Sequence, residues 1–467
     1  MAYILPTRLS FAPISLAALR RWLLPFVALA APPSLMGAQG SPSGAAAPVT
    51  LDQVFDSVRS NSPILGAARA RARAARGGLS SARAWGNPVL SFESEKMSEQ
   101  DPAMTSSRRE TMAMAMLPLE PIYQRGPRIR RAAAMIRASE ADVLTDRQQV
   151  AADAADAFYV AALAQVNVDA TRSVAQWFDT VVTYNRIRVR EGVAAEADLI
   201  RSELERDLVL NGLAMAESDL ARATADLQTF IGPGTTVAGR VEVDSLPLDS
   251  ASIRHVDVRR LGIAAPLATE PGVPNRPATP YSRPEVEAAR ARLEAAEAAS
   301  SGERRMFVRD VGAMIGTKNA EGSSSLVAGF TLPLPLLDQN RGNIAIARAE
   351  RDAAQFWYEH EMRKANAEIA GAENAARILS RRVAGFGLGR GSYLSRADDA
   401  RRIALGAYRE GGTSLLQVID AARAWREARS SYFETLFAQH RAVIRLLVAD
   451  GIDVIEAWPR MRGGGRP

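Results

Sequence analysis

The sequence of 467 residues contains no cysteine. Its absence excludes a disulfide framework, a thiolate metal site, a cysteine nucleophile and a lipidated N-terminal cysteine anchor. Histidine is nearly as scarce, because only His255, His360 and His440 occur, far apart in the chain. A histidine-based zinc site or a conventional catalytic triad is therefore not expected. The inventory predicts no enzyme, no catalytic residue, no cofactor and no resident metal.

Lysine is also scarce, and positive charge comes almost entirely from arginine. Basic residues number 58 against 52 acidic ones, which leaves a formal net charge of +6. This mixed-sign balance does not indicate a nucleic-acid-binding surface. Hydrophobic residues make up 47% of the chain, enough for one large core or several small ones.

A long hydrophobic run is missing as well, and the short one present lies at the N-terminus. Arg20 and Arg21 precede an apolar run at 22–31, which small residues follow. This order is typical of a secretory signal. The alternative, a membrane anchor, needs roughly 20 apolar residues, and this run is shorter and contains Pro25. We predict a signal peptide over 1–38 and a flexible lead-in over 39–50.

The rest of the chain contains two copies of one plan. Arg-Glu-Gly at 190–192 recurs at 409–411, and another glycine, Gly232 or Gly451, stands forty residues after each. Leu-Pro-Leu at 117–119 likewise recurs at 332–334. The sequence therefore predicts repeat 1 over 51–232, a Pro-rich linker over 233–283, repeat 2 over 284–451 and a C-terminal tail over 452–467.

Each copy has the same predicted order of elements. A first helix is expected over 51–84 in copy one and 284–302 in copy two. Two strand-like segments joined by a polar turn then predict a β-hairpin. The hairpins are expected over 88–97 with 111–117, and over 306–317 with 324–332. A long helix and a returning helix complete each copy, so the fold class is mainly α with a small β part.

The long helices show the apolar spacing of a coiled coil. Residues 128–191 contain no glycine and no proline, and a seam spaced by four and three residues runs along them. In copy two a glycine run at 385–391 lacks the spacing of a phosphate loop and is expected to break the long helix. The first seam consists of Val150, Ala154, Ala157, Ala161, Ala164, Val168, Thr171, Ala175, Phe178 and Val182.

Four strands per chain cannot close a barrel, because about eight is the minimum. Closure would need several chains, and cyclic symmetry is the usual arrangement.

With this plan the sequence resembles the TolC-type outer-membrane factor family of outer-membrane efflux proteins. The segments that carry the resemblance are 332–344 (LPLPLLDQNRGNI), 409–420 (REGGTSLLQVID) and Asn87-Pro88. The first segment is also similar to the branch that serves cation-efflux pumps of the resistance-nodulation-division type. The resemblance implies a homotrimer in outer-membrane lipid, with a twelve-stranded β-barrel and a coiled-coil α-barrel through the periplasm. It also implies docking to a periplasmic adaptor protein and an inner-membrane efflux pump.

The resemblance places candidate site residues near the second helix turn. Two acidic positions ring the tunnel mouth in the family, and here they are Gln417 and Asp420, so one matches and one departs. The alternative for Asp420 is a solvated residue near a helix N-terminus. The turns between the long helices are expected either to face the adaptor or to serve only as turns. Thr413 or Ser414 can cap the returning helix. The predicted tip residues are Gly192, Val193, Gly411, Gly412, Thr413 and Ser414.

Met112, Met114 and Met116 alternate and therefore share one strand face. A lipid-facing or packed strand is favoured there over a soft-metal path.

The function indicated is a passive exit duct for metal ions or small toxic compounds. The alternative is a periplasmic coiled-coil adaptor or scaffold without a pore, which would have no use for the strand hairpins.

Overall fold

A computed structural model describes residues 49–97, 108–119, 121–232, 283–306, 311–320, 323–387, 389 and 391–463. The predicted signal peptide and nearly all of the predicted linker lie outside these residues, as does His255. The described part is mainly helical, with one four-stranded sheet, which confirms the predicted fold class. The elements of the first copy are α1 (Leu51–Asn61), α2 (Pro63–Arg83), β1 (Val89–Met97), β2 (Arg108–Pro118), α3 (Pro121–Arg190) and α4 (Glu196–Ile231).

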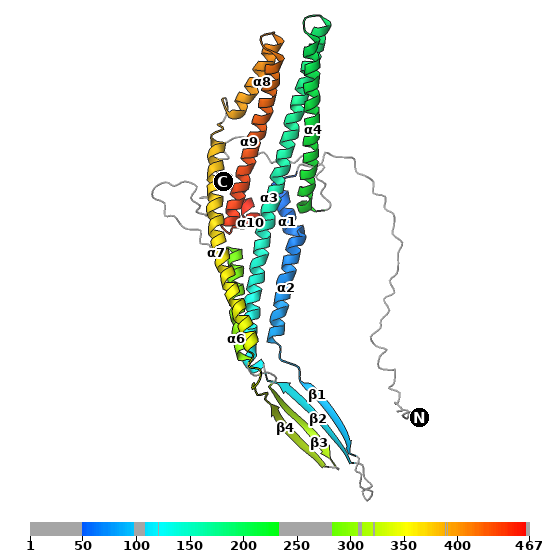
Figure 1. Ribbon diagram of the computed structural model, residues 1–467, viewed down its shortest axis with the longest axis vertical. Helices are drawn as coiled ribbons and strands as arrows, with labels where there is room; N and C mark the ends of the chain where they lie inside the picture. Colours follow the sequence, from blue (N-terminus) through cyan, green and yellow to red (C-terminus); the bar gives the residue numbers. More distant parts are fainter. Residues whose placement is uncertain are drawn as a thin grey trace, which may run out of the picture. The chain divides into compact units, whose positions relative to one another are not determined.

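The second copy repeats this order with one difference, a division of its long helix (Figure 1). Its elements are α6 (Pro284–Arg305), β3 (Gly312–Ala320), β4 (Ser323–Thr331), α7 (Arg341–Ala384), α8 (Tyr393–Arg409) and α9 (Leu415–Ala449), and α10 (Val454–Gly463) follows.

The first predicted helix is two helices, because the chain breaks at Ser62. Ser62 has extended backbone angles, φ −65° and ψ 118°, which the residue before a proline favours. Its hydroxyl accepts a hydrogen bond from the Leu65 N–H, so it caps α2, and Pro63 occupies the first helical position. The prediction of one helix over 51–84 is therefore wrong at this position.

The helix α3 has 70 residues and begins seven residues earlier than predicted, so Gly126 and Pro127 lie inside it. Its predicted seam is confirmed as a packing surface: Val150, Ala154 and Ala161 are buried, and so are most of the other members. The helix can be this long because α2, α4, α6 and α9 all pack against it. Their contacts supply stability that an isolated helix would lack.

The predicted break in the second copy is confirmed. The helix α7 ends at Ala384 and α8 begins at Tyr393, with Gly387, Gly389 and Gly391 at positive φ between them. The α6 helix also runs three residues past its predicted end, and the following strand starts at Gly312 instead of 306. Arg304 and Arg305 favour this extension, since cations stabilise the last turn of a helix.

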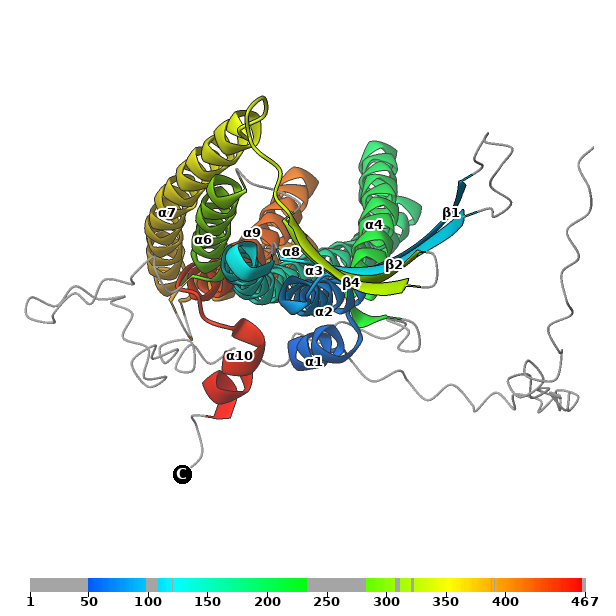
Figure 2. The same ribbon diagram turned by 90° about the horizontal axis from the view of Figure 1, so that it is seen from below.

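The two predicted hairpins join into one antiparallel sheet of order β1-β2-β3-β4. In the register, Val89 of β1 pairs with Met116 of β2, and Met116 pairs in turn with Met314 of β3. Gly312 of β3 pairs with Thr331 of β4. Figure 2 shows the strands as one curved layer. Within the described residues β1 and β4 have no further strand beside them, so both edges of the sheet are open.

Two clusters of buried side chains form most of the core. One lies where α1, α3, α4, α9 and α10 meet and includes Phe158, Leu227 and Phe437. The other lies closer to the helix tips, where α3 packs against α8 and α9 through Phe178 and Ile419. The tips of the helical hairpins lie at the end of the helices remote from the sheet (Figure 1).

Candidate functional site

The first predicted tip lies between α3 and α4 and is a tight hydrogen-bonded turn. Gly192 has φ +72°, the left-handed region that glycine adopts without a Cβ clash. The Val193 N–H donates to the Arg188 carbonyl at 2.9 Å. The Gly192 N–H donates to the Val189 carbonyl at 3.0 Å. These two bonds are the Schellman motif, which ends a helix by satisfying its last carbonyls. Val193 is 60% exposed at the outer end of the turn.

The second predicted tip, between α8 and α9, has the same geometry. Gly411 has φ +77°, and its N–H donates to the Tyr408 carbonyl at 3.1 Å. The Gly412 N–H donates to the Ala407 carbonyl at 2.8 Å. The repeat seen in the sequence therefore extends to matching backbone hydrogen bonds at both tips.

The predicted cap of α9 differs from the structure. Ser414 occupies the N-cap position, with extended angles of φ −84° and ψ 157°, but its side chain makes no cap hydrogen bond. The Thr413 hydroxyl donates to the side-chain oxygen of Gln417 instead. Thr413 thus binds a side chain, and the Gln417 N–H of the first turn donates to the Ser414 carbonyl at 3.1 Å.

Gln417 and Asp420 lie on one exposed face of α9, three residues apart. The opposite face holds Leu415, Val418 and Ile419, which are buried against the chain's own core. Both candidate mouth residues therefore point away from that core. Within the described part of the chain, no ion pair uses the Asp420 carboxylate.

Polar contacts near the tips join the two helical hairpins, and sequence reasoning missed them. The Tyr408 hydroxyl donates to the Asn185 Oδ1 at 2.6 Å, and Asn185 is fully buried in α3. Burial raises the pKa of Tyr408, which keeps this donor protonated. The Tyr184 hydroxyl donates to the Arg409 carbonyl at 2.9 Å. A tyrosine three residues before the tip glycine was the available signal, but nothing in the sequence paired it with Asn185.

An ion pair also joins α9 to α4. Arg423, one turn after Asp420, binds both oxygens of Glu205 at 2.9 and 2.7 Å. Both contacts come from one guanidinium nitrogen, Nη2, and form a charge-assisted hydrogen bond shared between the two carboxylate oxygens. It also leaves Arg423 engaged within its own chain and not with Asp420.

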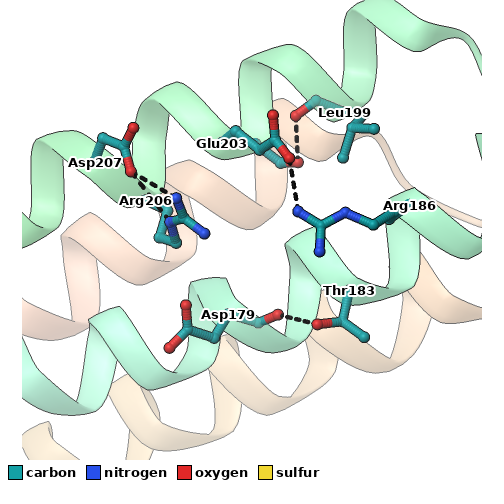
Figure 3. A network of polar contacts seen from close by, with 8 residues as sticks. Asp179, Thr183, Arg186, Leu199, Glu203, Arg206 and Asp207 are labelled. Atoms are coloured by element: carbon teal, nitrogen blue, oxygen red, sulfur yellow. Dashed lines mark hydrogen bonds and ion pairs between the residues drawn. The ribbon is translucent and has the colours of Figure 1, made fainter.

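Figure 3 shows polar contacts along α3 and α4, most of them within one helix, and the Arg186–Glu203 ion pair joins the two helices. Arg186 of α3 binds Glu203 of α4 at 2.9 Å, while Arg206 binds its neighbour Asp207. The Arg186 side chain is 61% exposed, and exposed pairs contribute at most about 1 kcal/mol. The Arg186–Glu203 pair contributes to the pairing of α3 with α4. The residues of Figure 3 do not form a catalytic arrangement.

The sheet has two chemically different faces, which follow from the alternation of side chains. One face carries large apolar residues that are strongly exposed: Leu90, Phe92, Ile315, Leu326 and Phe330 are between 57% and 79% exposed. The register puts Glu93, Glu110 and Lys318 on the other face. There the Lys318 Nζ lies 2.7 Å from a Glu110 oxygen.

The described residues contain no group of three or more histidine, cysteine, aspartate or glutamate side chains placed to hold a metal ion. Among the same residues, no helix is both long enough and apolar enough to span a bilayer.

Comparisons with known proteins agree with this architecture. The family model of outer membrane efflux proteins matches residues 54–233 and 281–451. The cobalt-zinc-cadmium resistance protein CzcC of Cupriavidus metallidurans is 25% identical over 416 residues, covering 86% of this chain and 90% of that protein. The nickel and cobalt resistance protein CnrC of the same organism is 29% identical over 295 residues, covering 63% of this chain and 65% of that protein.

A solved structure shows the same fold. The crystal structure of CusC, described with its transmembrane channel formation, matches with a TM-score of 0.68 at 17% identity, covering 89% of this chain and 96% of that chain. The matched family segments include both strand pairs and both helical hairpins described above. The chain therefore belongs to the outer membrane efflux protein family.

Proposed function

We propose that three copies of this chain form a passive exit duct in the outer membrane, with a helical extension through the periplasm. The duct would release metal ions or small toxic compounds that an inner-membrane pump, of the resistance-nodulation-division type, delivers through a periplasmic adaptor. The family membership supports the efflux role. The names of CzcC and CnrC, which refer to cobalt, zinc, cadmium and nickel resistance, support metal ions as the cargo.

The observation that carries this proposal is the two-faced sheet with two open edges. Leu90 and Phe330 expose 79% and 77% of their surface on the apolar face, which suits contact with lipid. The opposite face carries Glu93 and Lys318, which suits a water-filled interior. Three chains would supply twelve strands and pair each open β1 edge with a neighbour's β4, which removes the exposed edges.

Exposed apolar side chains on the helices also favour several chains. Leu204 and Leu208 of α4 are each 61% exposed, and Phe356 and Trp357 of α7 are 69% and 65% exposed. Surfaces of this kind mark protein contacts in soluble regions. A neighbouring copy would cover them in the trimer.

The tips and the mouth have separate proposed roles. The exposed turns at Gly192-Val193 and at 411–414 would contact the adaptor. Asp420, on the exposed face of α9, would line the narrow mouth, so that three carboxylates attract cations there. The alternative, a periplasmic scaffold without a pore, is disfavoured because it gives the two-faced sheet no role.

Assembly and conduction test this function in one preparation. Native mass measurement of the detergent-solubilised protein should give a trimer, and planar bilayers should show discrete channel openings. Asp420→Ala should lower cation selectivity and weaken block by multivalent cations, because charge leaves a narrow aqueous passage. Gln417→Glu adds a carboxylate on the same face and should act in the opposite direction. A folded monomer that never conducts would contradict the duct, and selectivity unchanged in both variants would contradict the mouth.

A further inference from the structure

Four methionines lie on the polar face of the sheet. Met112, Met114 and Met116 alternate along β2 and so share one face. Met314 of β3 pairs directly with Met116 and therefore joins them. The sequence favoured a lipid-facing or packed strand for this stripe. The register favours a packed over a lipid-facing strand, because the methionines share their face with Glu93 and Lys318, whereas the most exposed apolar side chains, such as Leu90 and Phe330, lie on the other face.

The four methionines are here called the methionine patch, and the spacing lets three of them, Met114, Met116 and Met314, bind one ion. Directly opposite residues in an antiparallel pair have Cβ atoms about 4.5–5.5 Å apart, which applies to Met116 and Met314. Met114 is two residues from Met116, about 7 Å along the strand. Methionine has three rotatable side-chain bonds, so the sulfur atoms of Met114, Met116 and Met314 can converge.

Glycines in the neighbouring strands leave room for the long methionine side chains. A Cβ built on Gly312 would lie 3.3 Å from the Met116 sulfur, and one on Gly329 would lie 3.6 Å from the Met314 sulfur. Glycine weakens a strand interior and marks a close approach of another group. These positions let the Met116 and Met314 side chains lie across the adjacent strands.

We propose that the methionine patch binds soft monovalent metal cations, Cu⁺ or Ag⁺, along the polar face of the sheet. Thioether sulfur is a soft ligand that favours Cu⁺ over harder ions. Unlike a carboxylate or an imidazole, it carries no proton that a metal must displace, so its affinity should not fall in mild acid. Glu93 on the same face adds negative charge that attracts a cation, whereas Glu110 is paired with Lys318.

The proposal rests on the proposed function, in which this face lines the duct. Three chains would bring three such patches around one passage. Neutral thioether sites hold an ion without the strong charge of a carboxylate cage, and a conducting path needs sites that release the ion as well as bind it. The methionine patch would thus give the duct a preference for soft cations, which the carboxylates at its mouth do not supply.

Silver binding to the purified full-length protein in detergent tests the site. Titration with Ag⁺ in chloride-free buffer should show saturable binding at pH 7 and at pH 5. The combined variant Met114→Leu, Met116→Leu and Met314→Leu should bind roughly tenfold more weakly or worse. Leucine conserves volume, so the fold should persist, and circular dichroism checks it. The matched controls are Met135→Leu and Met215→Leu, which change exposed methionines on α3 and α4 and should bind as wild type.

Two results would overturn the site: silver binding that the triple variant retains, and silver binding that the two control variants weaken to the same degree. Bilayer recording of the same samples separates this inference from the proposed function. Channels that conduct potassium but show no silver binding at the patch contradict the site alone. Protein that binds silver at the patch but never conducts contradicts the duct alone.

Discussion

The long helix of the first copy and its counterpart in the second follow one plan but are stabilised differently. The helix α3 runs unbroken for 70 residues, whereas the second copy divides the same path into α7 with 44 residues and α8 with 17. Six helices, α1, α2, α4, α6, α9 and α10, contact α3, while α7 packs mainly against α6 and α9. Only Ala347, Ala365 and Ala376 of α7 are buried in the chain. The continuity of the long helix therefore follows the number of helices packed against it and not the repeat itself.

Phe386, directly after α7, is buried at the break in the second copy. This ring is 4% exposed and lies 5.0 Å from the Tyr393 ring and 5.1 Å from the Tyr432 ring of α9. The Tyr393 N–H donates to the Phe386 carbonyl at 2.9 Å. The Ser392 hydroxyl then caps α8. Phe386 thus adds to the contacts of α7 and α8 with α9, such as the Gln439–Ser380 and Trp425–Asp398 hydrogen bonds.

The largest expected effect distinguishes the packing of α3 from that of α7 and α8. Phe178→Ala removes a fully buried ring from α3 and should destabilise the chain by about 3–5 kcal/mol. Urea unfolding followed by circular dichroism measures this loss.

Phe386→Ala should instead raise hydrogen exchange at 385–392 and in α8 while leaving α3 protected. Exchange that rises equally in α3 and α8 would show that the break is not a local structure.

A smaller effect tests whether the two tips are equivalent. Gly192→Ala and Gly411→Ala should each cost about 1–2 kcal/mol, because both residues have positive φ. An added Cβ meets no atom within 4 Å at either tip, so the cost comes from the backbone alone. Gly212→Ala inside α4 is the matched control and should stabilise the helix by about 0.5–1 kcal/mol. Unequal costs at the two tips would contradict the matching geometry.

Much of this architecture could be predicted from residue patterns, because the patterns reflect local rules. The paired Arg-Glu-Gly motifs located both tips, and the glycine run at 385–391 located the break. Two boundaries differ from prediction: the helix expected over 51–84 breaks at Ser62, and α3 contains Gly126 and Pro127, which precede its predicted start at 128. At Gly126 and Pro127, packing of α3 against its neighbours overrides helix propensity.

The contacts of the candidate site could not be predicted, because they join distant parts of the chain. The Tyr408–Asn185 hydrogen bond spans 223 positions, and only the packing of α8 on α3 creates it. Likewise, strand alternation put Met112, Met114 and Met116 together but did not say which face was polar. That required the register with β1 and β3. Asp420 was placed by family resemblance, and its role at the mouth remains a proposal.

The smallest expected effect concerns pH, where the two copies again differ. His440 and Asp450 lie in and after α9, while the positions 219 residues earlier are Ala221 and Ile231. Burial lowers the pKa of His440 from 6.5 to about 4, beside the Tyr159 ring of α3. The pKa of Asp450 is raised from 3.8 to about 6, mainly by burial and also by Glu373, while Arg283 opposes the rise.

These two groups act on stability with opposite signs. A histidine whose pKa is lowered by folding stabilises the folded state above pH 6.5, and this contribution is lost as the pH falls toward 4. An aspartate whose pKa is raised by folding destabilises the folded state above pH 6, and the penalty is relieved as the pH falls through 6 toward 3.8. The histidine is the more deeply buried of the two, so the loss of stability that it causes at lower pH should exceed the gain from Asp450.

Urea midpoints at pH 7.5 and pH 6 should therefore show a small net loss of stability, roughly 0.5 kcal/mol, in the acidic buffer. His440→Gln removes the titrating imidazole and should abolish the loss or turn it into a small gain. Asp450→Asn removes the opposing gain and should make the loss larger than in wild type. If His440→Gln keeps the wild-type pH dependence, the acid sensitivity does not come from this histidine. Its counterpart in the first copy is Ala221, which does not titrate.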